Sequence, residues 1–317
     1  MRDNNFIIEN NAKHLWHPMG APRDSINNPP KVITNANGSQ ISDIDGHTTV
    51  DAVGGLWCVN LGYSNEAVKK AISEQLNHLP YYSGFAGTTN PAAIEASFMV
   101  KEMFKADGME KVFFTSGGSD SVETCLRLSR QYHRLRGEPT RTKFISLKKG
   151  YHGTHFGGAS VNGNNRFRIA YEPLLPGCFH LPSPYTYRNP FNETDPQKLA
   201  LNIAQAFEDE IAFQDKNTIA AFIMEPIQGA GGVIVPDPSF MGLMQEICER
   251  NGILMISDEV ITGFGRTGSW SGARHWNVKP DMMSMAKGIT SGYFPVGAAL
   301  MSEKVADAFE NSNSAEA

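Results

Sequence analysis

Five polar or aromatic residues each stand just after a short apolar run, and this spacing constrains the fold more than any other feature of the sequence. The apolar runs alternate with segments of helical periodicity from residue 111 onward. Strands that alternate with helices favour a mainly parallel sheet covered by helices on both faces. In such sheets ligands bind outside the carboxyl ends of the strands. We therefore expect a site at this edge that contains Ser116, Tyr151, Glu225, Asp258 and Lys287.

Two of these residues point to a particular chemistry. Lys287 follows the apolar run 282–285, and Asp258 lies just beyond the predicted buried strand 252–256. A desolvated lysine loses its charge readily and can then form a Schiff base. A carboxylate in the same cavity needs a cationic group to face. Pyridoxal phosphate meets both needs, since its aldehyde takes the lysine and its ring nitrogen takes the carboxylate. Taken singly, Lys287 is more typical of a solvated lysine, and Asp258 with Glu259 of an acidic helix start.

Composition limits the class of protein. The chain has 317 residues, 41% of them hydrophobic, which is enough for one large domain or two. A net charge of −5, from 28 basic and 33 acidic residues, argues against a nucleic-acid binder. The four cysteines show no metal-binding spacing, which favours reduced thiols in a cytosolic protein. With no secretory signal and no membrane-length apolar run, we expect a soluble, cytoplasmic protein without a membrane or nucleic-acid partner.

The first part of the chain has a different pattern from the rest. Residues 1 to about 30 combine a short amphipathic piece with a run rich in Pro and Asn, which predicts an arm that lies on other surfaces. Two turn signals, Asn37-Gly38 and Asp45-Gly46, separate alternating apolar residues and predict a β-hairpin or meander. We predict an N-terminal arm and hairpin in residues 1–55, part of a small domain, and a large domain in residues 56–317.

The remaining elements follow from periodicity and turn residues. Helices are predicted in five segments and strands in five others, while residues 160–200 are predicted to be connections. The helical segments are the stretch after the loop at 55–64, then 91–105, 121–136, 199–211 and 240–250, and the strands are 111–115, 143–147, 218–224, 252–257 and 295–301.

The turn Ser116-Gly117-Gly118-Ser119 between a strand and a helix has three interpretations. Backbone amides at a helix start form a phosphate site, but the same sequence also fits an ordinary turn with an N-cap residue. Gly117 to Ser121 also differs by one residue from the nucleophile elbow of serine hydrolases, so a hydrolase at Ser119 stays open as a remote alternative. His152 and His155 have no carboxylate within helical reach, so no metal site is expected.

Seven segments together resemble the class III pyridoxal-phosphate aminotransferases, the omega-transaminases of fold type I. They are HLWHP, DIDGHTTVDAVGGLWCVNLGY, VFFTSGGSDSVETCLRL, YHGTHFGG, MEPIQGAGG, ISDEVITGFGRTG and PDMMSMAKGITSGYFPVGA, and they extend from His14 to Ala298. The combination of the last four is highly specific, and the branch it resembles most is that of the amine–pyruvate and polyamine–pyruvate enzymes. The resemblance implies an α/β fold with a seven-stranded, mainly parallel sheet.

The resemblance also implies roles for single residues. Lys287 would be the Schiff-base lysine and Asp258 the partner of the pyridinium nitrogen. Gly118 and Ser119 match the turn that cradles the phosphate, although Ser116 and Gly117 depart from the asparagine and serine common there. The other implied contacts are Tyr151 stacked on the ring, Val260 on the opposite face, Gln228 at the ring hydroxyl and Glu225 in support of Asp258. Trp57, Phe85 and Tyr151 would line an aromatic substrate pocket, although each alone also fits a core aromatic.

The implied activity is transfer of an amino group from a primary amine, diamine or omega-amino acid to pyruvate or a similar keto acid. It would proceed by a ping-pong mechanism through a Lys287 Schiff base, with the pyridoxamine form between the two half-reactions. The resemblance further implies a homodimer, or a tetramer, with shared active sites.

One departure concerns the end of the chain. Relatives continue with a C-terminal portion that carries a threonine for the partner subunit's phosphate site, an arginine for the substrate carboxylate and most of the small domain. We therefore expect a truncated chain. Two further alternatives stay open, namely a non-catalytic relative that binds the cofactor, and another fold-type I enzyme such as a racemase, mutase or decarboxylase.

Overall fold

The computed structural model describes residues 3–85 and 87–314. By the density of its internal contacts the chain divides into two compact units, Met1–Tyr81 and Tyr82–Ala317. This division concerns compactness. The predicted boundary between residues 55 and 56, which concerns the domains of a complete fold, therefore stays a prediction.

The first unit contains a three-stranded antiparallel meander. Strand β1 (Ile33–Asn37) pairs with β2 (Gln40–Asp43), which pairs with β3 (Thr48–Val50). Asn37 lies opposite Gln40, so the first predicted turn is a two-residue loop in which Gly38 adopts a φ of 58°. The predicted meander is therefore confirmed. The helices of this unit are α1 (Asn4–Asn10), α2 (Pro22–Asn27), α3 (Gly54–Trp57) and α4 (Glu66–His78).

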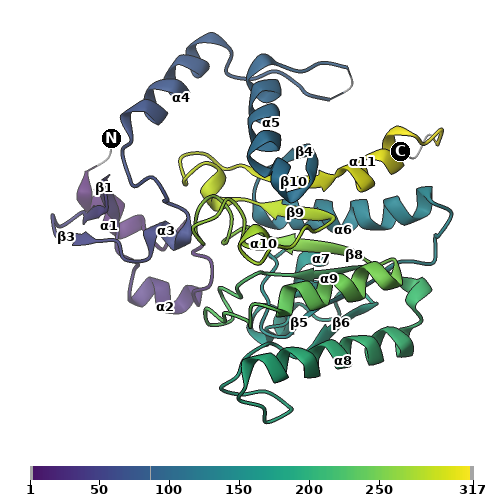
Figure 1. Cartoon of the computed structure of the whole chain (residues 1–317). Coiled ribbons are helices and arrows are strands. Elements are labelled where there is room, and N and C mark those ends of the chain that lie inside the picture. Colours follow the sequence, from purple (N-terminus) through teal and green to yellow (C-terminus); the bar gives the residue numbers. More distant parts are fainter. Residues whose placement is uncertain (1–2, 86, 315–317) are drawn as a thin grey trace. The chain divides into compact units, whose positions relative to one another are not determined.

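The second unit is built on a seven-stranded sheet (Figure 1). Its strand order is β4-β10-β9-β8-β7-β5-β6, and the pairs from β9 to β6 are all parallel. Strand β10 runs antiparallel to both of its neighbours. The predicted α/β fold with a mainly parallel seven-stranded sheet is therefore confirmed. The strands are β4 (Met109–Thr115), β5 (Lys143–Leu147), β6 (Cys178–Leu181), β7 (Ile219–Met224), β8 (Leu254–Asp258), β9 (Met282–Met285) and β10 (Gly297–Ser302).

Helices cover both faces of this sheet because successive strand residues point to opposite sides. On β7, Phe222 and Met224 join one apolar cluster with side chains of α5, α8 and α9, whereas Ala221 and Ile223 join a second cluster with α6, α7 and α11. The helices are α5 (Pro91–Phe104), α6 (Gly118–Leu135), α7 (Phe156–Val161), α8 (Pro196–Gln214), α9 (Phe240–Asn251), α10 (Gly272–His275) and α11 (Glu303–Glu310). Short 3-10 turns lie at Lys105–Asp107, Asn165–Phe167, Ile169–Tyr171, Lys216–Thr218 and Lys287–Ile289.

Two features of this unit differ from the sequence-based expectation. Strand β6 lies inside the segment predicted as connections. The prediction missed it because its four residues are mostly half-buried and show no periodic pattern among the surrounding Pro and Asn residues. The helix α6 begins at Gly118 rather than after the turn, so Gly118 and Ser119 of the turn belong to the helix, followed by Asp120.

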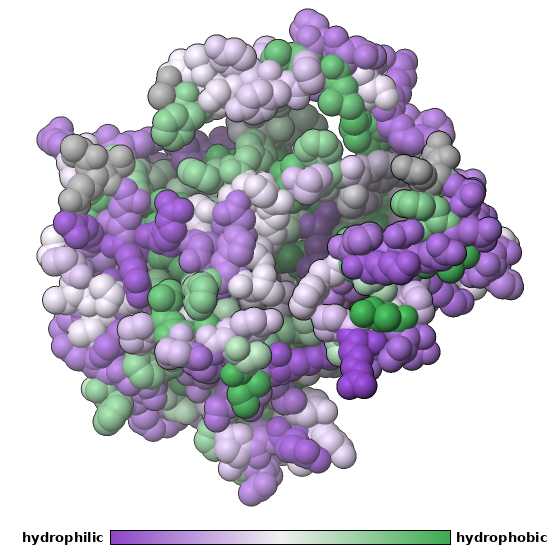
Figure 2. Space-filling view, turned by 180° about the vertical axis from the view of Figure 1, so that it is seen from behind, coloured by the Kyte–Doolittle hydropathy of each residue, from purple (hydrophilic) through white to green (hydrophobic). Residues whose placement is uncertain are grey.

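Hydrophobic residues on the face drawn in Figure 2 are interspersed with hydrophilic ones. Among the described residues, no helix combines the length and the apolarity that crossing a membrane requires.

Phe222 gives a test of this core. Its side chain is 0% exposed, whereas Phe213 on α8 is 84% exposed. We expect Phe222→Ala to lower the free energy of unfolding by about 3–5 kcal/mol, because it leaves a cavity beside the α8–α9 layer. The matched variant Phe213→Ala should change it by about 0.5 kcal/mol or less. Urea unfolding measures both, and equal effects would contradict the assigned layers.

Candidate active site

A cavity of about 430 Å³ lies in the second unit, outside the carboxyl ends of β4, β5, β7, β8 and β9. The five residues that follow the predicted apolar runs all contribute to its wall. The parallel strands end at the same edge of the sheet, so residues from positions 116 to 287 meet there. Its full lining is Ser116, Gly117, Gly118, Ser119, Val122, Tyr151, His152, Gly153, Glu225, Asp258, Val260, Ile261, Ala286, Lys287, Thr290, Gly292, Phe294, Pro295 and Val296.

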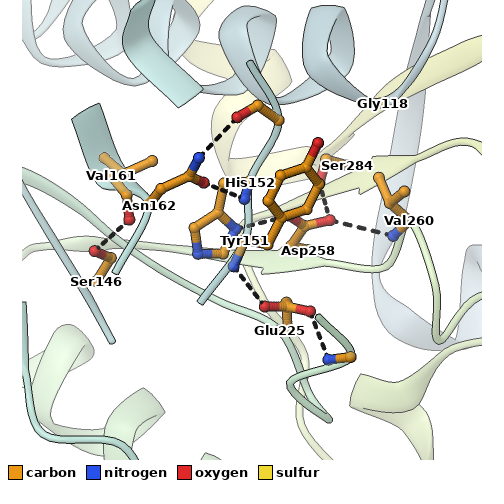
Figure 3. Close-up of polar contacts among 12 residues, drawn as sticks. Gly118, Ser146, Tyr151, His152, Val161, Asn162, Glu225, Asp258, Val260 and Ser284 are labelled. Carbon is orange, nitrogen blue, oxygen red and sulfur yellow. Dashed lines mark hydrogen bonds and ion pairs between the residues drawn. The ribbon is translucent and has the colours of Figure 1, made fainter. Parts of the chain in front are cut away.

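Asp258 is the last residue of β8, and donors hold both of its carboxylate oxygens (Figure 3). Its Oδ2 lies 2.7 Å from Nδ1 of His152. Its Oδ1 accepts hydrogen bonds from Ser284 Oγ at 3.0 Å and from the backbone N–H of Val260 at 3.2 Å. The side chain is 3% exposed, and a buried carboxylate is stable only when donors of this kind surround it. Oδ2 keeps a second lone pair for a further donor.

His152 is a site residue that the sequence analysis missed. Its ring is fully buried, and its Nε2 has no hydrogen-bond partner among the described residues. Nδ1 therefore carries the proton that Asp258 accepts. The backbone N–H of His152 donates to Asn162 Oδ1, and Asn162 Nδ2 donates to the carbonyl of Gly153 at 2.9 Å, which fixes the segment that carries the ring. The signal in the sequence is a histidine next to Tyr151 just after a strand, rather than a metal-binding spacing.

Glu225 lies beyond β7 with its carboxylate between two backbone donors. Oε1 accepts from the N–H of Tyr151 at 2.9 Å, and Oε2 accepts from that of Gly229 at 2.9 Å. Burial, to which the nearby Asp258 charge adds, raises the pKa of the Glu225 carboxyl to about 7. The group therefore ties the segment after β5 to the segment after β7, as Figure 3 shows.

Lys287 starts the 3-10 turn that follows β9 and adopts a φ of 47°. A positive φ is uncommon for a residue with a β-carbon and costs of order 1–3 kcal/mol unless the surrounding structure enforces it. Ala286, the N-cap of the turn, is buried, so the residue before Lys287 is packed in the protein interior. Of the described residues that line the cavity, Lys287 is the one with a primary amine.

The N-terminus of α6 opens into the same cavity. Gly117 is the N-cap, and the cap makes no side-chain hydrogen bond to the helix. Unsatisfied N–H groups of the first turn and the helix dipole favour an anion at such a position. Ser119 Oγ accepts from the N–H of Thr154 at 3.1 Å. A β-carbon on Gly153 would lie 2.6 Å from that oxygen, so the close approach of this segment to α6 requires glycine here.

Tyr151 and Val260 complete the wall near Asp258. Burial, together with the carboxylates of Asp258 and Glu225, raises the pKa of the Tyr151 phenol, so the ring stays neutral. Its ring centroid lies 4.6 Å from that of Phe167. The side chain of Val260 packs against α6, where a β-carbon on Gly118 would lie 3.2 Å from it.

Glu259 is not the exposed acid of a helix start. It is 0% exposed, and its two oxygens accept four hydrogen bonds. Two of the donors are backbone N–H groups, those of Gly272 and Ala273, one on each oxygen. The others are the hydroxyls of Ser257 and Thr262. The carboxylate thus anchors the chain on either side of Asp258 to the start of α10.

Three predicted contact residues are not among those that line the cavity. The Gln228 amide donates to the carbonyl of Lys148 at 3.0 Å, and its Oε1 accepts from Ser183. Phe85 is 87% exposed. Trp57 belongs to the first unit. The roles given to Gln228 at the cofactor ring and to Phe85 and Trp57 in the substrate pocket stay predictions.

One cluster of possible metal ligands lies in the first unit. Ligand atoms of Asp43, Asp45 and His47 lie within 4.8 Å of one another. The Asp43 carboxylate accepts from the backbone N–H groups of Asp45 and His47. These bonds account for the cluster as part of the turn between β2 and β3.

The fold and the cavity together define the class of protein. The chemistry of the lining residues fits pyridoxal phosphate, since a lysine amine, a carboxylate with a spare lone pair and a helix N-terminus meet in one cavity. These are the groups that its aldehyde, ring nitrogen and phosphate require.

Comparison with known proteins identifies the family. The family model for class III aminotransferases matches residues 22–317, so the chain belongs to this family, whose cofactor is pyridoxal phosphate. An amine transaminase from an uncultivated Pseudomonas species, solved in its pyridoxal phosphate-bound form, is 46% identical with a TM-score of 0.94. That match covers 96% of this chain and 68% of the other. An (S)-enantioselective omega-transaminase from Thermomicrobium roseum is 34% identical with a TM-score of 0.95, over 99% and 70% of the two chains.

Among curated proteins, a putrescine–pyruvate aminotransferase of Pseudomonas aeruginosa is 38% identical over 277 residues. An uncharacterized aminotransferase of Bacillus subtilis is 38% identical over 312 residues. The matches cover 87% and 98% of this chain but 60% and 66% of the relatives. The chain therefore spans less than two thirds of the length of these curated relatives.

The raised pKa of Glu225 predicts a pH-dependent stability. Between the ordinary pKa of 4.5 and the folded value of about 7, the folded state keeps a proton that the unfolded state has released. The contribution of this group to the free energy of unfolding therefore falls as pH rises through this window, by about 3 kcal/mol in total. Glu225→Gln cannot titrate, so the stability of the wild type relative to this variant should fall by this amount.

Urea unfolding of the cofactor-free protein at several pH values across the window measures the difference. The exposed variant Glu246→Gln serves as the control and should follow the wild type at every pH. Parallel pH curves for the wild type and Glu225→Gln would contradict the assignment.

Proposed function

We propose that this protein is an omega-transaminase that moves an amino group from a primary amine, diamine or omega-amino acid to pyruvate or a similar keto acid. The observation that carries the proposal is the meeting of Lys287 with a donor-held Asp258 in one cavity at the strand ends. Family membership supports it, and so do relatives described as amine, omega- and putrescine–pyruvate transaminases.

Pyridoxal phosphate, when bound, supplies an aldehyde that condenses with amines and a ring that takes up electron density from the substrate carbon. Asp258 would hold its ring nitrogen, and the backbone at Gly118 and Ser119 would hold its phosphate. Tyr151 and Val260 would contact the two faces of the ring, and Gln228 would face the ring hydroxyl. Backbone N–H groups serve the phosphate without the side chains usual at positions 116 and 117.

Asp258 would hold the positively charged ring nitrogen of the cofactor. A carboxylate next to a protonated ring nitrogen favours its charged form. His152 donates to Oδ2 and Ser284 to Oδ1, so the carboxylate cannot rotate away from the cavity without losing both bonds. His152 and Ser284 are therefore positioning residues for Asp258, and Glu225 supports the same wall through the backbone of Tyr151.

Lys287 acts first as a nucleophile and then as a proton carrier. With the cofactor bound, the amine of Lys287 would hold the aldehyde carbon until an incoming amine takes its place. It would then accept the proton of the substrate carbon as general base and give it back as general acid. The strained backbone at Lys287 fixes where this amine can reach.

The donor preference follows from aromatic residues. With Trp57, Phe85 and Tyr151 around the substrate, the pocket would favour amines with an apolar or extended carbon chain over small diacids. One similar solved structure is a transaminase variant with a tryptophan replaced by glycine, engineered for the asymmetric synthesis of enantiopure bulky amines, with 34% identity to this chain and a TM-score of 0.92.

We also propose a homodimer with shared sites. We propose a cytoplasmic location, which agrees with the four free cysteines. The serine hydrolase alternative loses support, because Ser119 has no histidine partner among the described residues. A non-catalytic relative, or another enzyme with the same cofactor, differs from this proposal in the outcome of the next experiment.

Lys287→Ala should abolish transamination while pyridoxal phosphate still binds noncovalently, because the phosphate and ring contacts remain. The measurements are the visible absorption of the protein after removal of free cofactor and the transfer of amino groups from an amine to pyruvate. Lys198→Ala, at an exposed position on α8, is the matched control and should keep the wild-type rate. A wild-type protein that binds the cofactor without any transfer would favour the non-catalytic alternative. Transfer at an undiminished rate in Lys287→Ala would exclude the role given to this lysine.

Asp258→Asn should reduce the rate of the amine half-reaction about a hundredfold or more, which corresponds to about 3 kcal/mol of transition-state stabilisation. The amide keeps the shape of the side chain but no longer favours a charged ring nitrogen. Stopped-flow absorption with saturating amine measures the rate, with the exposed variant Asp307→Asn as the control. An unchanged rate constant would remove Asp258 from this role.

A further inference from the structure

The short helix α3 (Gly54–Trp57), which follows β3 in the first unit, has left-handed φ angles at all four of its residues. Gly54, Gly55, Leu56 and Trp57 have φ values of 58°, 60°, 68° and 65°. Glycine adopts this region freely, but each of the two residues with a side chain costs of order 1 kcal/mol or more. Such a run is stable only where neighbouring groups hold the backbone in this conformation.

Asp51 is the centre of these groups. Its Oδ1 accepts from the backbone N–H of Val53 at 3.1 Å, and its Oδ2 accepts from that of Gly55 at 2.7 Å. The hydroxyl of Tyr63 donates to the same Oδ2 at 2.6 Å. One carboxylate thus holds the entry to the left-handed run and a side chain from beyond its end. We call the Asp51–Tyr63 hydrogen bond the clasp.

Tyr63 is itself fixed to the meander. Its backbone N–H donates to the carbonyl of Gly38 at 2.7 Å, and its carbonyl accepts from the N–H of Gly38 at 3.1 Å. The hydroxyl of the next residue, Ser64, donates to the carbonyl of Ala36 at 2.7 Å. The clasp therefore connects the left-handed run to the β1–β2 turn.

Space and protonation agree with this arrangement. A β-carbon on Gly55 would lie 2.5 Å from Val59 and 3.1 Å from the Tyr63 hydroxyl, so the run fits only with glycine at this position. The hydrogen bond to Asp51 raises the pKa of the Tyr63 phenol to about 12, and that bond, with the backbone donors, lowers the pKa of the Asp51 carboxyl. Donor and acceptor are thus both in the required protonation state around neutral pH.

We propose that Asp51 and Tyr63 are positioning residues that hold Trp57 in its left-handed conformation and so set the size of amine donor that the enzyme accepts. This inference rests on the proposed function, in which Trp57 lines the substrate pocket. Without the clasp, residues 54–57 relax to ordinary backbone angles, and the Cα–Cβ bond of Trp57 then points in a different direction. A large aromatic side chain that changes direction admits some donors and excludes others.

Fluorine NMR of the cofactor-loaded protein labelled with 5-fluorotryptophan tests the conformational part. The chain has four tryptophans, and Trp57→Phe assigns the signal of interest by its loss. Tyr63→Phe removes one hydroxyl and keeps the backbone bonds to Gly38. We expect it to shift or broaden the Trp57 signal and to leave the Trp276 signal in place. An unchanged Trp57 signal would overturn the proposal.

A matched variant controls for loss of a tyrosine hydroxyl. Tyr81, the last residue of the same unit, is 79% exposed, so Tyr81→Phe should leave all four signals unchanged. An equal change of the Trp57 signal in Tyr81→Phe would overturn the role of the clasp. Asp51→Asn provides a second test, because its weaker acceptor should move the same signal in the same direction.

Kinetics test the specificity part. In Tyr63→Phe we expect the ratio of kcat/KM for a bulky aromatic amine to that for a short aliphatic amine to change about tenfold, with cofactor absorption unchanged. An equal loss for both donors would overturn the specificity role. A wild-type protein without transamination would refute the proposed function, whereas the fluorine signals would still decide whether the clasp orients Trp57.

Discussion

The buried hydrogen bond between His152 and Asp258 is the interaction on which the arrangement of the site depends. A carboxylate at the end of a central strand is stable only if donors compensate for its lost hydration, and His152, Ser284 and the N–H of Val260 provide them. These donors come from three different segments of the chain. Holding Asp258 in place therefore also holds the segments after β5 and β8 against β9.

A second buried carboxylate extends this constraint. Glu259 is not among the residues that line the cavity, and its carboxylate accepts hydrogen bonds from two backbone N–H groups at the start of α10. The two neighbouring acids therefore bind different parts of the chain. Glu225 does the same between the segments after β5 and β7. Three carboxylates bonded to backbone donors therefore connect the irregular loops at the sheet edge to one another. The cost is a set of buried ionisable groups, of which Glu225 titrates near neutral pH.

The sequence predicted the elements best where the period was clear. Strand β7, with six buried residues, was found within one residue of its bounds, whereas β6 was missed because its half-buried residues lie among Pro and Asn. Of the candidate cofactor residues, Gly118, Ser119, Tyr151, Glu225, Asp258, Val260 and Lys287 line one cavity, and Gln228 does not. His152 was missed because its function depends on Asp258, and a bond across 106 positions leaves no trace in local spacing.

The sequence by itself determined the alternation of strands and helices and the polar residues at the strand ends, because apolar periodicity and residue type carry these directly. The class of cofactor followed from the resemblance of seven segments to a known family. Only the tertiary structure decided which donors hold Asp258, that Glu259 is buried and that β10 runs antiparallel. It also decided that residues 54–57 are left-handed. Each of these depends on groups distant in the chain that meet only after the sheet has formed, and burial then decides which of their hydrogen bonds must be made.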